Sequence, residues 1–479
     1  MTTTAKQPGR RRRPPRSSRR PEDLRPEGPT ADLSEELTGG NGVFIAQPDE
    51  FEWGAGYTEE EFVAAGAATA YAPVGELTPD GLWTLAPTET AEYRTRVLVR
   101  RPTRAEDFSG TVLVEWLNVS GGADADPALT YLREEIQRQG HAWVGVSAQQ
   151  LGVDGGDVLV PVDVPEAEGI AGQGLKKVDP ERYGSLSHPG DAFMFDIYTQ
   201  VARALRGGAG LGDLQPQNLI AIGQSQSAAA LVTYINGVSP LDEVFDGYFV
   251  QSRSASPLNI PAIGDQADFV SSFGAPPTQF RADTEVPVFN LQAEIDVVSI
   301  FHSVDARQPE ADFLRLWEVA GTAHADARLV GEARAESIDC GVPMINNSPM
   351  HVVSKAAFRH LVKWVATGEE PPEAPLLDVA NAEMQRNADA IALGGVRTPP
   401  VDVPAEVLSG APGPNPDVIC LLAGSTTPLP DARLTTLYPS RADYEERYAA
   451  ALDAAIEAGY VLEEDRGALE QYAHPELLD

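Results

Sequence analysis

The stretch Gly223-Gln224-Ser225-Gln226-Ser227 separates an apolar run (NLIAI, residues 218–222) from an alanine-rich run that starts at residue 228. The first run predicts a buried strand over 219–222, and the second predicts a helix to about residue 235. A serine between two small residues at a strand-to-helix turn is typical of a nucleophile elbow, because bulk at either flanking position would collide with the strand or the helix. The Gln226 N–H then lies at a helix N-terminus and can donate to a developing oxyanion. The pattern predicts Ser225 as a nucleophile.

The partners that such a serine needs follow it in the chain. A serine hydroxyl reacts only when a base takes its proton and a carboxylate orients that base. With an elbow of this kind the chain order is serine, acid, histidine, and each residue follows a later strand. Asp296 follows the strand predicted over 286–292, and His324 follows the strand predicted over 313–319. The sequence therefore predicts the triad Ser225, His324 and Asp296.

Two choices within this triad have competitors. Glu294 comes directly off the same strand and is the alternative acid, whereas Asp296 is two residues on, where the loop has turned over the sheet edge. His302 comes too early, because it precedes the next strand. The remaining histidines begin or precede elements, lie in a helix or lie near the C-terminus: His141, His188, His351, His360 and His474.

A second oxyanion donor is expected from the loop after the first long buried strand, which is predicted over 110–118. That loop holds Val119, whose N–H is the predicted donor, followed by Gly121 and Gly122. The two glycines allow close approach of the backbone to a substrate, or they serve only a tight turn.

The rest of the chain alternates strands and helices, which predicts a mainly parallel sheet covered on both faces. Loop-rich segments 150–188 and 254–283 leave the strand ends near the proposed cleft, where open α/β sheets bind ligands, so both are predicted as lid or pocket insertions. Asp-rich stretches near 124–126 and 154–157 lack the spacing of a calcium loop and are predicted to be solvated turns. Further strands are predicted over 67–75, 91–101, 141–148 and 244–251, and helices over 191–205, 352–365 and 442–458.

Three regions are predicted. Residues 1–38 form a disordered basic tail, residues 39–370 the α/β body, and residues 371–479 a C-terminal extension packed on that body, with the boundary at the Glu369-Glu370-Pro371-Pro372 run. The glycine-rich run at 207–212 follows a helix and precedes a strand, the reverse of a dinucleotide-binding loop, so it is predicted to be a linker.

The elbow, the motif EID after VPV (residues 286–296) and GTAHAD (321–326) together resemble the α/β-hydrolase superfamily. The runs VEWLNVS (114–120) and LYPS (437–440) are similar to a poorly characterised bacterial group of α/β-hydrolase domain proteins. The resemblance implies an eight-stranded sheet and a serine esterase-type mechanism. Ser227 departs from the superfamily pattern, which has a glycine there, but serine is still small.

The composition limits the partners. The 479 residues carry a net charge of −35; residues 1–25 hold nine basic and two acidic side chains, so the rest carries −42. An acidic body is unsuited to nucleic acid. No apolar run is long enough to span a membrane, and no export signal precedes the body, so a cytoplasmic location is predicted.

Cys340 and Cys420 are too few for a cysteine-built zinc site; they are either bridged or free buried thiols. Neither metal nor cofactor is expected.

The sequence therefore predicts a cofactor-independent serine hydrolase that acts on small-molecule carboxylic esters. An amidase or an acyltransferase needs the same triad, and a non-catalytic binding protein could keep the fold. The sequence indicates neither the substrate nor the oligomeric state.

Overall fold

The computed structural model describes residues 28–48, 53–158 and 170–478, and its centre is one large sheet. The nine strands lie in the order β1-β2-β3-β5-β4-β6-β7-β8-β9. Strands β1 to β3 and the β3–β5 pair are antiparallel, whereas the strands from β5 to β9 run parallel to one another. The bounds are β1 Asp32–Glu36, β2 Tyr57–Pro73, β3 Leu85–Pro102, β4 Thr111–Trp116, β5 Ala142–Val146, β6 Asn218–Gln224, β7 Gly247–Gln251, β8 Val288–Ala293 and β9 Leu314–Val319.

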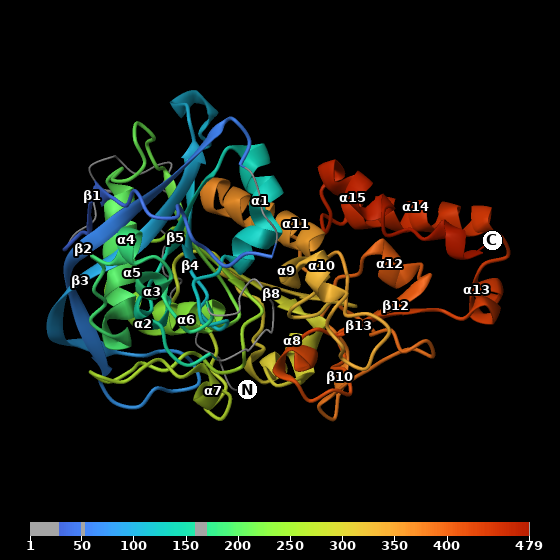
Figure 1. Ribbon diagram of the computed structural model, residues 1–479. Helices are drawn as coiled ribbons and strands as arrows, with labels where there is room; N and C mark the ends of the chain where they lie inside the picture. Colours follow the sequence, from blue (N-terminus) through green and yellow to red (C-terminus); the bar gives the residue numbers. More distant parts are fainter. Residues whose placement is uncertain (1–27, 49–52, 159–169, 479) are drawn as a thin grey trace.

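Helices cover both faces of the sheet, as the near-continuous apolar strands predict (Figure 1). On one face α5 (Met194–Arg206) and α6 (Gln226–Thr233) pack against side chains such as Val114 and Val250. On the other face α1 (Pro127–Gln139) and α11 (Met350–Thr367) pack against Phe249 and Trp317, among others. All parallel strands therefore end at one edge, where the loops that follow β6, β8 and β9 meet.

A buried carboxyl group links β4 to α1. Glu115 is fully buried and accepts hydrogen bonds from the N–H groups of Ala128 and Leu129 and from Nε1 of Trp143. These bonds satisfy donors in the first turn of α1. Burial, reinforced by the charge of Asp126, nevertheless raises the pKa of Glu115 to about 8. Glu115 therefore stays protonated in the folded protein at pH values where the unfolded chain has lost that proton.

This shift predicts how stability depends on pH. The folded state binds the extra proton, so the contribution of Glu115 is complete below its ordinary pKa of 4.5 and is lost as pH rises through about 8. Glu115→Gln cannot ionise and still offers an acceptor to α1. We expect the free energy of unfolding of the variant, measured with urea, to rise relative to that of the wild type as pH increases from 5 to 8. Parallel pH profiles for the two proteins would contradict the shifted pKa.

The N-terminal part of the sheet differs most from the sequence prediction. The described chain starts at residue 28, and β1 lies inside the region predicted to be a tail to residue 38; it adds a ninth strand to the eight predicted. β1 (DLSEE) is mostly exposed and carries no apolar alternation, so its sequence resembles a solvated segment. β2 begins ten residues before the predicted strand 67–75. The prediction missed this first part because it holds three consecutive glutamates, at positions 59–61, and no apolar alternation. Residues 1–27 lie outside the described residues.

The predicted insertions contain short helices. Within 150–188 these are α2 (Gln150–Asp154), α3 (Leu175–Val178) and α4 (Pro180–Tyr183), while residues 159–169 lie outside the described residues. Segment 254–283 contains α7 (Phe269–Ser272). The N–H of Gly172 donates to the carbonyl of Gly122, so the first insertion contacts the loop that follows β4.

The C-terminal segment packs at the β9 end of the sheet (Figure 1). Val396 pairs with Val319 and covers the edge of β9, which would otherwise present unpaired backbone groups. The carboxylate of Asp465 forms ion pairs with Arg138 of α1 and Lys355 of α11. The boundary after residue 370 stays a prediction. The elements not yet named are α8 (Glu294–Val298), α9 (Ala327–Val330), α10 (Glu332–Ala335), β10 (Val379–Ala380), β11 (Glu383–Met384), α12 (Pro399–Asp402), β12 (Glu406–Ser409), β13 (Ser425–Pro428), α13 (Asp431–Leu437), α14 (Arg441–Glu457) and α15 (Arg466–Glu470).

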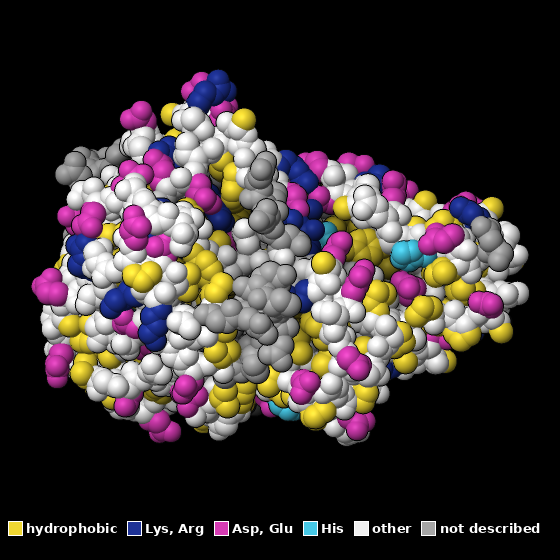
Figure 2. All heavy atoms as spheres, in the orientation of Figure 1, with side chains coloured by type: hydrophobic (Ala, Val, Ile, Leu, Met, Phe, Trp, Pro, Cys, Tyr) yellow, Lys and Arg dark blue, Asp and Glu magenta, His cyan; other side chains and the backbone are white. Residues whose placement is uncertain are grey.

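Cys340 and Cys420 form a disulfide, which settles the alternative that the sequence leaves open. Acidic side chains are scattered over the face shown in Figure 2 and form no single patch there. Among the described residues, no helix has the length and apolar character that a membrane crossing requires.

Candidate active site

Ser225 sits at the turn between β6 and α6 with φ of 62° and ψ of −121°, a strained conformation for a residue other than glycine. Gly223 explains why small flanking residues are required: a Cβ there would lie 2.9 Å from the backbone of Ser227. Ser227 is itself fully buried against this turn, so serine fits where the superfamily pattern has glycine.

A matched pair of variants tests this steric explanation. Gly223→Ala places a methyl group against the backbone of Ser227, so we expect a folded but displaced elbow, with turnover reduced at least tenfold and a lower melting temperature. Ser227→Ala removes only a hydroxyl that has no hydrogen-bond partner among the described residues, and it should keep turnover within about twofold. Equal losses in the two variants would show that the close approach at Gly223 does not constrain the turn.

The loops after β8 and β9 bring the other two predicted residues to Ser225. Nε2 of His324 lies 2.8 Å from the Ser225 hydroxyl, and Nδ1 of His324 lies 2.7 Å from Oδ1 of Asp296. Asp296 also accepts from the N–H of Ala293 at 2.8 Å, which fixes its carboxylate at the start of α8. Asp296 is fully buried, His324 is 4% exposed and Ser225 is 8% exposed, so exposure to solvent increases toward the serine.

Glu294, the alternative acid, has other partners. Its carboxylate accepts from the N–H groups of Gly321 and Gly410, at 2.6 and 2.9 Å, and pairs with Arg386 at 2.5 Å. Glu294 therefore ties the loop that carries His324 to the C-terminal segment, and it makes no hydrogen bond to the imidazole.

The loop after β4 lies beside the elbow. The amide of Asn118 donates to the carbonyl of Gln224 at 3.0 Å, and the hydroxyl of Ser120 donates to the side chain of Gln226 at 3.1 Å. Within the loop, the N–H groups of Asn118, Ser120 and Gly122 are already bonded. Val119 is 2% exposed, and its N–H has no hydrogen-bond partner in the described part of the chain. A buried, unpaired N–H next to the nucleophile is what an oxyanion donor requires.

The sequence prediction missed what holds this loop. Asp124 and Asp126 were expected in a solvated turn, but they are 1% and 2% exposed. Asp124 pairs with Arg96 at 2.7 Å and Asp126 with Arg100 at 3.0 Å, both from β3. Glu61 of β2 also pairs with Arg96, at 3.0 Å. The prediction of solvated turns at 124–126 is therefore wrong, because the arginines that neutralise these carboxylates lie on a strand that is distant in sequence.

The imidazole is also covered by an aromatic side chain. The ring of Phe301 stacks on that of His324, with centroids 4.3 Å apart and 15° between the planes. Phe301 in turn contacts Phe273 and Phe269 of the second insertion, with centroids 5.5 and 6.3 Å away. The 254–283 insertion therefore supports one face of the histidine. The signal in the sequence was only three separated phenylalanines.

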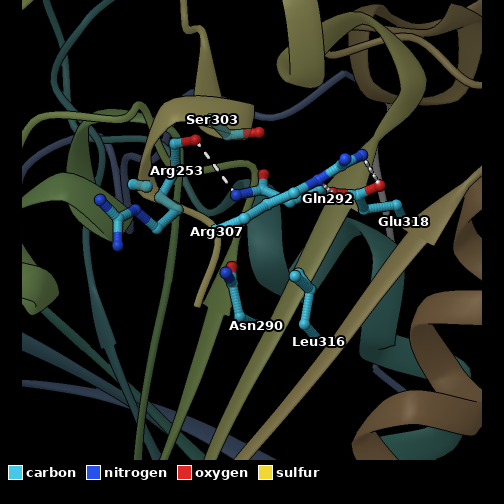
Figure 3. A pocket seen from close by; sticks show the side chains of 8 residues that line it. Arg253, Asn290, Gln292, Ser303, Arg307, Leu316 and Glu318 are labelled. Atoms are coloured by element: carbon cyan, nitrogen blue, oxygen red, sulfur yellow. Dashed lines mark hydrogen bonds and ion pairs between the residues drawn. The ribbon is translucent and has the colours of Figure 1, made fainter. Parts of the chain in front are cut away.

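A small polar cavity lies beside β8 and β9 and contains none of the three predicted residues (Figure 3). In that view the side chain of Arg307 reaches Glu318, and the two form an ion pair of 2.5 Å. Oδ1 of Asn290 and Oε1 of Gln292 have no hydrogen-bond partner among the described residues, so this cavity suits ordered water. No group of three or more His, Cys, Asp or Glu side chains suited to a metal ion occurs among the described residues.

Similar solved structures include a serine hydrolase without lid from Xanthomonas campestris, at 13% identity and a TM-score of 0.28 over 53% of this chain and 83% of that one. Carboxyl esterase 2 from the mycorrhizal fungus Tuber melanosporum has 11% identity and a TM-score of 0.32 over 66% of this chain and 91% of that one. No curated protein sequence matches. The family model described as "Alpha/beta hydrolase domain" matches residues 27–471. The chain therefore belongs to the alpha/beta hydrolase domain family.

Proposed function

We propose that this protein is a serine hydrolase that cleaves carboxylic esters of small molecules through an acyl-enzyme. The observation that carries the proposal is the unbroken chain of hydrogen bonds from Asp296 through His324 to Ser225, with distances of 2.7 and 2.8 Å. Two short hydrogen bonds of this kind give the serine a base and give the base an orienting carboxylate.

Each residue has a role in the proposed reaction. Ser225 Oγ attacks the acyl carbon while Nε2 of His324 takes its proton, and Asp296 holds Nδ1–H and stabilises the imidazolium. His324 then returns the proton to the leaving alcohol. Water attacks the acyl-enzyme with His324 again as the base, which releases the acid and frees Ser225.

Two backbone N–H groups are proposed to hold the oxyanion. Gln226 is the first residue of α6, where N–H groups have no partner within the helix and the helix dipole favours negative charge. Val119 supplies the second donor from the loop after β4. Each donor contributes about 3 kcal/mol to transition-state stabilisation.

Hydrolysis of a p-nitrophenyl acyl series tests the proposal, with stopped-flow detection of p-nitrophenol. We expect a burst equal to the enzyme concentration followed by slower turnover, the kinetic sign of an acyl-enzyme. Faster cleavage of the matched p-nitroanilide would indicate an amidase, and an added alcohol acceptor that yields more transferred ester than free acid would indicate an acyltransferase. No turnover by folded protein across the whole series would overturn the proposal and favour a binding protein.

A cytoplasmic location stays a prediction. The Cys340–Cys420 bridge argues against it, because structural disulfides persist mainly in oxidising compartments.

A further inference from the structure

The loop that carries His324 is held by the C-terminal segment, about 100 residues later in the chain. The carbonyl oxygen of Leu422 accepts hydrogen bonds from the backbone N–H groups of both His324 and Ala325, each at 3.1 Å. Gly424, two residues on, has φ of 56°, and a Cβ added to it would lie 2.4 Å from the carbonyl oxygen of Ser409 and 3.1 Å from the side chain of Ala323. The backbone of the loop that carries His324 therefore contacts residues 422–424 directly.

A buried asparagine connects this contact to the rest of the loop. Asn346 has no exposed surface; its N–H donates to the carbonyl of Ala423 at 3.0 Å, and its side-chain amide donates to the carbonyl of Gly321 at 2.8 Å. The carbonyl of Asn346 accepts from the N–H of Ala327 at 2.8 Å. Asn346 thus bonds to both ends of the 321–327 loop and to the C-terminal segment.

The disulfide lies next to these contacts. Cys420 is two residues before Leu422, and Cys340 is six residues before Asn346. The disulfide therefore joins the two segments whose residues bond to the 321–327 loop. Both cysteines are fully buried. The other contacts that hold segment 418–424 are the hydrogen bonds of Leu422 and Ala423, van der Waals contacts, and the hydrogen bonds of Thr426, just beyond it, to Met344 and Asn347. The bridge adds a covalent restraint to them.

We infer that segment 420–424, locked by the Cys340–Cys420 disulfide, is a positioning element for the general base His324. The inference rests on the proposed function. Nε2 and Nδ1 must stay within hydrogen-bond distance of Ser225 and Asp296 at the same time, so a shift of the His324 backbone breaks one bond or both. A displacement of about 1 Å in a catalytic group can lower turnover by roughly 10²-fold. The C-terminal segment is then part of the active site.

Removal of the disulfide tests this inference. Because both cysteines are buried, the bridge is reduced with dithiothreitol in urea: the two thiols of dithiothreitol become a cyclic disulfide, and Cys340 and Cys420 each end as a thiol. The urea is then removed with dithiothreitol still present, and alkylation of a denatured aliquot confirms that the bridge is open. The chain has only two cysteines, so no other bond responds. We expect kcat for a p-nitrophenyl ester to fall at least tenfold with KM within about twofold, and reoxidation to restore it. Cys340→Ala/Cys420→Ala reaches the same low kcat without reductant, and dithiothreitol does not change it further.

A pair of glycine variants tests the contact itself with the disulfide intact. Gly424→Ala forces a methyl group against the carbonyl of Ser409 and against Ala323 of the His324 loop. Gly394→Ala is the control, because it has a similar backbone strain at φ of 74° and a similar approach to a backbone carbonyl, that of Leu376 at 2.3 Å, without a contact to the His324 loop. We expect only Gly424→Ala to lower kcat at least tenfold and to displace the acid limb of the pH–rate profile, because a displaced imidazole protonates in changed surroundings.

Fold and chemistry are separated by the controls. Circular dichroism and melting curves give the folded fraction of each sample, and a loss of kcat no larger than the loss of folded protein overturns the positioning role. Unchanged kcat in both the reduced protein and Gly424→Ala, while the wild type turns over in a Ser225-dependent way, also overturns it. No Ser225-dependent turnover in the untreated wild type instead overturns the proposed function, and this inference with it.

Discussion

Ser225→Ala should abolish ester turnover, with kcat reduced by on the order of 10⁶-fold. The alanine keeps the elbow and the oxyanion N–H groups, so the residual rate is that of water held near polarising donors. Binding of a substrate should change little, because the Ser225 hydroxyl contributes chemistry and little contact area. Initial rates with a p-nitrophenyl ester at high enzyme concentration measure the residual turnover.

Ser252 offers a matched control for this variant. It is a buried serine that follows the parallel strand β7 and also has a positive φ, of 56°. No hydrogen bond joins it to the imidazole in the described structure, so Ser252→Ala should keep kcat within a few-fold. A loss in Ser252→Ala that matched the loss in Ser225→Ala would mean that these substitutions act on folding and not on a nucleophile.

The second large effect distinguishes the two candidate acids. Asp296→Asn keeps the shape of the side chain but presents an amide to His324, which favours the wrong tautomer and cannot stabilise an imidazolium; we expect kcat to fall about 10⁴-fold. The N–H groups of Gly321 and Gly410 bond to different oxygens of Glu294, so Glu294→Gln keeps an acceptor for only one of them, and it weakens the ion pair with Arg386. We expect it to lower the melting temperature and to cost less than about tenfold in kcat.

The comparison has a clear contrary outcome. If Glu294→Gln abolished turnover at full folding while Asp296→Asn retained it, Glu294 would be the acid, and the hydrogen bond between Asp296 and His324 would be incidental. The pH dependence of kcat should be recorded for both variants. Glu294 bonds to Gly321 in the loop that carries His324, so Glu294→Gln can affect kcat indirectly, through that loop.

The sequence predicted the parallel core and the three proposed reacting residues because both depend on local signals. Buried parallel strands are continuous apolar runs, and Asp296 and His324 each follow such a run in the order that this topology requires. Glu294 could be set apart from Asp296 only by its distance from the strand end. Asp296 bonds to His324 and Glu294 pairs with Arg386, and the assignment of Asp296 as the acid stays a prediction.

What the sequence could not predict depends on pairing across long separations. β1 has no apolar periodicity and forms only because β2 offers an edge. Asp124, in the loop after β4, is buried because Arg96 of β3 neutralises it. The hydrogen bond between Leu422 and His324 joins backbone atoms alone, so no pattern of side chains in the sequence predicts it.

The proposed nucleophile is tested most directly by covalent labelling of the intact protein with a fluorophosphonate, followed by intact mass measurement and peptide mapping. The proposed function predicts one phosphonyl adduct per chain on Ser225, absent from Ser225→Ala and present on Ser252→Ala. Folded wild-type protein that takes up no adduct, or an adduct that maps to another residue and persists in Ser225→Ala, would contradict it.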